Sequence, residues 1–163
     1  RQGRTLQLYS CSGPARLLDP YSYYRLQAWH CRQIRATGSF FWAFSDTAGA
    51  PCWNEYASTV GPYTPVYLDE KAVVAGKAME AIRESVEDYE YFVMLRAAAD
   101  RARAAGVDQL ILVKAETLLQ QAATDVLDAQ GAGNLMWHSP KDRTRADAER
   151  IRFLEVLSDL AHR

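Results

Sequence analysis

The sequence predicts an α/β protein in which helices occupy most of the chain. Two patterns predict this class: a strand, a helix and a second strand follow one another within the first 44 residues, and apolar residues recur at helical spacing from about residue 71 onward. The composition agrees with a globular domain that has a core, since 48% of the 163 residues are hydrophobic and 24% are charged.

The first part of the chain reads as a βαβ unit. Residues 5–11 are an apolar stretch of strand length, and Asp19 can cap the helix that follows. Gly38 lies just past the expected end of that helix, and residues 39–44 are apolar on both faces, as in a parallel strand covered by helices. The crossover between the strands should be right-handed. The helix has an apolar face made of Tyr24, Ala28, Cys31 and Ile34.

A long loop is expected next, over residues 45–65, because this stretch is rich in glycine and proline and has no sustained period. It contains Asp46 and Trp53. Loops at the carboxyl ends of parallel strands are where α/β enzymes bind ligands, so the sequence predicts binding residues here. Residues 66–68 read as a brief extra strand.

The remainder of the chain reads as three amphipathic helices. The first should run from about residue 71 to Ala105 and end at Gly106, and Asp108 can cap the second. A turn-rich stretch, residues 130–140, separates the second helix from the third. The expected buried faces are Met79, Ile82, Val86, Tyr89 and Val93, then Ile111, Ala115, Leu118, Ala122 and Val126, then Ile151, Leu154, Leu157 and Ala161.

Two pairs of adjacent carboxylates could suggest acid/base catalysis. Glu87 and Asp88 lie on the first long helix, where adjacent residues do not face each other, whereas two catalytic carboxylates must flank one bond. We therefore expect them on a solvated helix face. Asp69 and Glu70 follow the short strand, in a context that is typical of a turn and a helix cap.

Charge and spacing argue against several classes of function. A formal net charge of -1 provides no field to attract nucleic acid or anionic lipid, and no apolar run reaches the roughly 18 to 20 residues that span a bilayer. The cysteines and histidines are scattered, so we expect buried thiols, no metal site and no cofactor. These residues are Cys11, Cys31, Cys52, His30, His138 and His162.

One segment carries a family resemblance. Residues 83–92, Arg-Glu-Ser-Val-Glu-Asp-Tyr-Glu-Tyr-Phe, preceded by Glu80, resemble the RE-G-(I/V)-EDYEYL signature of the catalytic domains grouped as domain of unknown function 4091, which includes glycoside hydrolase family 123. The order of elements before it also matches, so the resemblance covers roughly residues 5–100. Ser85 stands where the family usually has glycine.

The resemblance implies a fold and an activity. Family members resemble (β/α)8 barrels that remove terminal N-acetylhexosamine, notably N-acetylgalactosamine, with retention, using the sugar's own acetamido group and an adjacent Asp-Glu pair on a middle strand. The matching elements here are the last two strands and the last helices, and a complete barrel takes about 250 residues. We therefore expect a partial (β/α)8 barrel over residues 1–106, followed by C-terminal amphipathic helices over 107–163. The catalytic pair would lie upstream of Arg1, so no catalytic residue is expected in this chain.

The residues expected to contact a carbohydrate substrate are Trp42, Asp46, Tyr9 and Trp53. Sugar rings stack on aromatic side chains, and their hydroxyls need polar partners. Trp42 would form the floor of the pocket and Asp46 would accept a hydroxyl hydrogen bond. The other interpretation is that Trp42 belongs to the strand core and Asp46 to a turn.

Two functions remain open from the sequence. In the first, the chain is part of a glycoside hydrolase, and its partners are the carbohydrate and the remainder of the barrel, with neither nucleic acid nor membrane. In the second, it is a non-catalytic helical scaffold or interaction module, since amphipathic helices occupy over half of it. The sequence favours no particular compartment.

Overall fold

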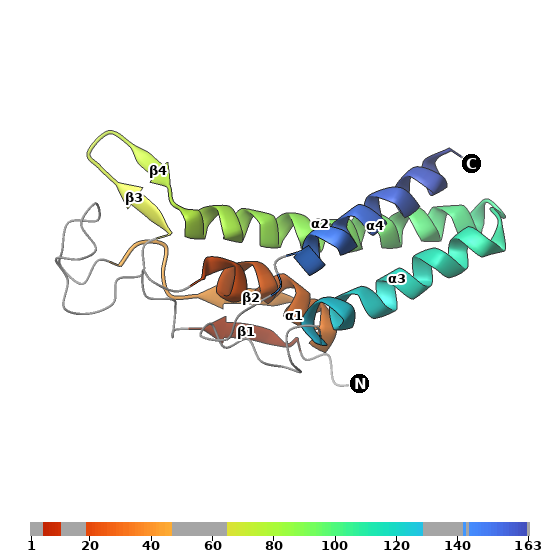
Figure 1. The fold of residues 1–163 in the computed structure, drawn as a ribbon, viewed down its shortest axis with the longest axis horizontal. Helices are drawn as coiled ribbons and strands as arrows, with labels where there is room; N and C mark the ends of the chain where they lie inside the picture. Colours follow the sequence, from red (N-terminus) through yellow and green to blue (C-terminus); the bar gives the residue numbers. More distant parts are fainter. Residues whose placement is uncertain (1–4, 11–18, 47–64, 129–141, 143, 163) are drawn as a thin grey trace. The chain divides into compact units, whose positions relative to one another are not determined.

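The computed structural model describes residues 5–10, 19–46, 65–128, 142 and 144–162. Helices make up most of these residues, as the sequence predicts (Figure 1). The described residues divide into two compact units. The sheet unit comprises those up to Ser85, and the helical unit comprises those from Val86 onward. The division falls inside one long helix, whereas the predicted boundary at residue 106 coincides with the end of that helix.

The sheet unit contains the predicted strand, helix and parallel strand. β1 (Gln7–Ser10) pairs with β2 (Gly38–Phe41) in parallel, with Gln7 opposite Gly38 and Ser10 opposite Phe41. A π-helical turn, η1 (Tyr21–Arg25), runs into α1 (Leu26–Ile34) and makes the crossover between them. The βαβ unit is confirmed, although both strands are shorter than the sequence suggests.

Local hydrogen bonds fix the two ends of this crossover helix. The Asp19 carboxylate accepts hydrogen bonds from the Tyr21 backbone N–H and the Ser22 hydroxyl, each at 3.2 Å, which confirms its capping role. The helix ends at Arg35, whose φ of 59° is left-handed, and not at Gly38. Gly38 instead begins β2, where an added Cβ would come within 3.2 Å of the Phe40 ring.

The core of the sheet unit joins η1 to the first turns of α2 (Lys77–Ala104). Tyr23 and Tyr24 are buried with Ala81, and the Tyr24 ring meets Phe41 of β2 edge-to-face at 5.0 Å. The Ala28 backbone N–H donates a 3.3 Å hydrogen bond to the buried hydroxyl of Ser85. A glycine at position 85 could not accept this bond. The side chain that departs from the family pattern therefore has a structural role here.

A hairpin precedes α2 and replaces part of the predicted helix. β3 (Val66–Leu68) confirms the brief extra strand, and it pairs antiparallel with β4 (Val73–Ala75), which the sequence reading missed. The helix begins at Lys77 because Gly76 lies against β3: its N–H donates to the Pro65 carbonyl at 3.0 Å, and an added Cβ would come within 3.1 Å of that oxygen. Asp69 and Glu70 are exposed at the hairpin turn.

The helical unit combines α2 from Val86 onward with α3 (Gln109–Asp128) and α4 (Thr144–Ala161). Gly106, at φ 70°, ends α2, and the Leu110 N–H donates to the Asp108 carboxylate at 2.8 Å, so both predicted signals are confirmed. The predicted face of α3 is confirmed in full. Its buried residues include Ile111, Ala115, Leu118, Ala122 and Val126.

The predicted buried face of α2 is wrong beyond Ser85. Val86 and Val93 are 57% and 49% exposed, whereas the buried positions follow a different stripe. The hydrophobicity of the two valines favours the wrong face, because the stripe that is buried contains one charged residue and two alanines. Alanine allows neighbouring helices to approach closely and is often buried. The buried residues are Asp88, Phe92, Leu95, Ala99 and Ala102.

The predicted face of α4 is wrong for a similar reason. Ile151 and Leu154 are 57% and 47% exposed, whereas Ala146, Glu149 and Phe153 are buried. The Phe153 ring is fully buried and meets Phe92 of α2 edge-to-face at 4.7 Å. Among the described residues, no helix is long and apolar enough to cross a membrane.

Candidate functional site

The candidate site lies along one face of the parallel strand pair and at its carboxyl end. Tyr9 of β1 and Phe40 of β2 are opposite each other in register, and side chains at such positions point to the same face of a sheet. The neighbouring Ser39 points to the other face, where its hydroxyl donates to the Gln27 side chain of α1 at 2.7 Å. We call the surface formed by Tyr9 and Phe40 the aromatic face.

The aromatic face is uncovered. Tyr9 is 62% exposed and Phe40 is 51% exposed, although the opposite face carries α1 and the buried core around Tyr24. A parallel strand pair normally has both faces covered. The strand pair therefore has one face covered by α1 and one exposed apolar face against which other residues can pack.

Trp42, which follows β2, is held by Asp46. Its indole Nε1–H donates a 2.7 Å hydrogen bond to Oδ2 of Asp46, a short contact of the kind that carboxylates make. Trp42 is 49% exposed, so it is not a strand-core residue, and Asp46 is half-buried. The arrangement presents an indole whose polar edge is fixed and whose ring is accessible. The contact between Asp46 and a sugar hydroxyl stays a prediction.

Two of the four predicted contact residues come close to this strand end, and a third is on the aromatic face. Trp42 and Asp46 contact each other, and Tyr9 lies in β1. Trp53 lies outside the described residues, as do Cys11, Cys52 and His138. The sequence reading missed Phe40, which the register of the parallel pair places beside Tyr9.

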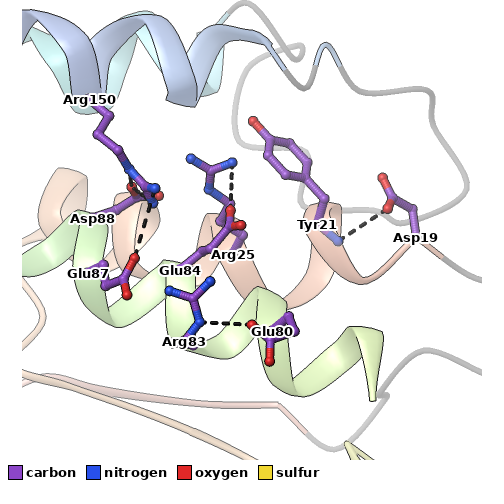
Figure 2. A network of polar contacts seen from close by, with 9 residues as sticks. All are labelled: Asp19, Tyr21, Arg25, Glu80, Arg83, Glu84, Glu87, Asp88 and Arg150. Carbon is purple, nitrogen blue, oxygen red and sulfur yellow. Dashed lines mark hydrogen bonds and ion pairs between the residues drawn. The ribbon is translucent and has the colours of Figure 1, made fainter. Parts of the chain in front are cut away.

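Asp88 is not on a solvated helix face. Its side chain is fully buried, and Oδ1 accepts hydrogen bonds from Nε and Nη2 of Arg150 in α4, at 2.9 and 2.6 Å (Figure 2). The prediction of a solvated face is therefore wrong for Asp88. The sequence near Asp88 gives no sign of its partner, because Arg150 lies 62 residues further along the chain. Glu87 is 43% exposed and 3.9 Å from the same guanidinium. The two carboxylates hold α4 through one cation, which is a structural role.

A second ion pair stabilises the sheet unit. Nη1 of Arg25, a buried residue of η1, lies 2.9 Å from the Glu84 carboxylate of α2, and its guanidinium is 5.3 Å from the centre of the Tyr21 ring (Figure 2). Arg83 and Glu80 make a 2.8 Å pair on the exposed side of the same helix. Four acidic residues in or just before the signature segment, Glu80, Glu84, Glu87 and Asp88, thus have basic partners within the protein. We assign none of them to substrate.

The remaining reactive side chains have structural surroundings. Cys31 is buried, as predicted, and burial raises the pKa of its thiol, while a hydrogen bond with Ser39 opposes this effect. A raised pKa lowers the thiolate fraction and the reactivity of the thiol. Within the described part of the chain, no group of three histidine, cysteine or acidic residues could hold a metal ion.

Comparison with known proteins identifies no relative of this chain. No family model matches the sequence, and no curated protein or solved structure is significantly similar to it. The geometry of the strand pair is therefore the basis for a functional proposal.

Proposed function

We propose that this chain forms the C-terminal part of a (β/α)8 barrel of the glycoside hydrolase type, which removes terminal N-acetylhexosamine from glycans with retention. In this proposal the chain supplies aromatic contacts to the sugar, and the acid/base pair comes from strands outside these 163 residues. The observation that carries the proposal is the exposed aromatic face of a parallel strand pair whose other face is covered by α1.

The aromatic face suits the inside of a barrel. In a (β/α)8 barrel the helices cover the outer face of the strands, and side chains of the inner face fill the barrel with residues from the other strands. Tyr9 and Phe40 are on the face opposite α1, so further parallel strands would bury them. Trp42 and Asp46 follow β2 at its carboxyl end, which is the end where barrel enzymes bind substrate.

The chemistry of this strand end fits a sugar. A half-exposed indole offers a flat apolar surface against which the C–H face of a pyranose can stack, and the Asp46 carboxylate holds the polar edge of that ring. The ion-paired acids of α2 are not assigned to the sugar, since Asp88 is buried against Arg150 and Glu84 is paired with Arg25.

The test uses the polypeptide that the complete gene encodes. We expect it to hydrolyse a chromogenic N-acetylgalactosaminide or N-acetylglucosaminide, and Trp42→Ala should lower kcat/KM by about tenfold or more, because a stacking contact is worth roughly 1–3 kcal/mol by analogy with other ring-stacking platforms. Asp159→Ala, an exposed acid of α4, is the control and should retain full activity. The proposal would be refuted by a complete polypeptide that folds but neither hydrolyses nor binds an N-acetylhexosaminide.

A second candidate function is a helical interaction module. Exposed apolar residues on the helices favour it, because such side chains can bury against a partner. In this non-catalytic alternative, removal of these side chains should abolish partner binding. They are Val86, Val93, Met94, Leu110, Val113, Ile151 and Leu154.

A further inference from the structure

We propose that Asp46 is a positioning residue that sets the orientation of the Trp42 indole for sugar stacking, rather than a residue that binds the sugar itself. This inference rests on the proposed function. Its physical basis, the contact between the two side chains, can be tested separately.

The contact has the features of an orienting bond. An indole has a single polar atom, the Nε1–H donor, which needs an acceptor when the ring is not fully hydrated. The 2.7 Å distance from Nε1 to Oδ2 of Asp46 is short for a nitrogen donor, as expected when the acceptor is charged. Because a tryptophan side chain has two main torsions, a bond at Nε1, which lies off the Cβ–Cγ axis, restrains both of them.

The surroundings of the ring make this restraint useful. Trp42 is 49% exposed and follows the end of β2, so packing alone holds it less firmly than the buried Trp29 of α1, which is 1% exposed. A half-exposed ring that samples several rotamers must be ordered when the sugar binds, and this ordering weakens binding by an amount equivalent to a few-fold to about tenfold. A ring that Asp46 already holds avoids that loss.

A double-mutant cycle separates positioning from direct contact. In the complete polypeptide we expect Asp46→Ala to raise KM about three- to tenfold with little change in kcat, and Asp46→Asn, which keeps an acceptor oxygen, to recover most of the loss. In a Trp42→Phe background, where the N–H is absent, Asp46→Ala should change KM less than about twofold. If Asp46→Ala has its full effect in that background, Asp46 contacts the sugar directly and the inference is wrong.

A spectroscopic measurement tests the contact without any substrate. In the ¹⁵N-labelled complete polypeptide, the indole N–H resonance that disappears in Trp42→Phe should shift in Asp46→Ala and stay in place in the control Asp159→Ala. An unmoved resonance would overturn the positioning role, even in an active enzyme. A shifted resonance in a polypeptide that neither binds nor hydrolyses N-acetylhexosaminides would support the contact while refuting the proposed function.

Discussion

The helical unit buries both of its phenylalanines, whereas the strand pair of the sheet unit leaves an aromatic face exposed, although both units carry exposed aliphatic residues as well. In the helical unit the whole expected face of α3 is buried, and Phe153 of α4 is fully enclosed. In the sheet unit, Tyr9 and Phe40 remain more than half exposed on one face of β1 and β2. A helix satisfies its backbone hydrogen bonds internally and needs only side-chain neighbours, whereas a parallel strand pair also needs strands along its edges. In the proposed barrel, further strands would lie along these edges.

The largest expected effect contrasts two phenylalanines. Phe153→Ala should destabilise the chain by about 3–5 kcal/mol, because it leaves a cavity beside Phe92, whereas Phe40→Ala should cost less than about 1 kcal/mol in the 163-residue chain. Urea unfolding followed by circular dichroism measures both. Equal losses would remove the distinction between the two units. In the complete polypeptide, the proposed barrel predicts a larger loss for Phe40→Ala than in the 163-residue chain.

A somewhat smaller effect concerns the buried ion pair of the helical unit. Asp88→Ala leaves the Arg150 guanidinium, which is 22% exposed, without its main partner, so we expect a loss of about 3 kcal/mol in the free energy of unfolding. Glu87→Ala is the matched control: its carboxylate is 43% exposed and 3.9 Å from the same group, and its loss should stay below about 1 kcal/mol. If the two variants lose the same stability, Asp88 does not hold α4 as described.

The smallest effect concerns the covered side of the sheet unit. Burial raises the pKa of the Cys31 thiol above its ordinary value of 9.0, so the folded state binds this proton more tightly than the unfolded state does. The protonated thiol therefore stabilises the folded state fully at pH values below the pKa of Cys31 in the unfolded chain. This stabilisation is lost as the pH rises through the higher pKa of Cys31 in the folded state. Between about pH 8 and 10, the wild type should therefore lose more stability than Cys31→Ala. Parallel pH profiles of the two proteins would contradict a buried thiol.

The sequence predicts the elements whose signals are local. Asp19, Asp108 and Gly106 mark helix ends through contacts with their own neighbours in the chain, and all three act as expected. The buried face of α3 also follows from its own periodicity. The order of strand, helix and parallel strand is confirmed for the same reason, since each element carries its pattern within a few residues.

The sequence does not predict features that depend on distant partners. The buried side of α2 is set by Phe153 and Arg150, which lie more than fifty residues away, and not by the most hydrophobic stripe of the helix. The sequence predicts helix over β4 because only its antiparallel pairing with β3 identifies it as a strand. At the candidate site, residue types suggested Trp42 and Asp46, but their mutual hydrogen bond required the structure.

The most direct test is an experimental structure of the complete polypeptide, in which the exposure of Tyr9 and Phe40 is measured. We predict that further parallel strands pair with the outer edges of β1 and β2, and that both aromatic side chains become buried inside the barrel while Trp42 lines the substrate pocket. Free strand edges with Tyr9 and Phe40 still on the surface would contradict it.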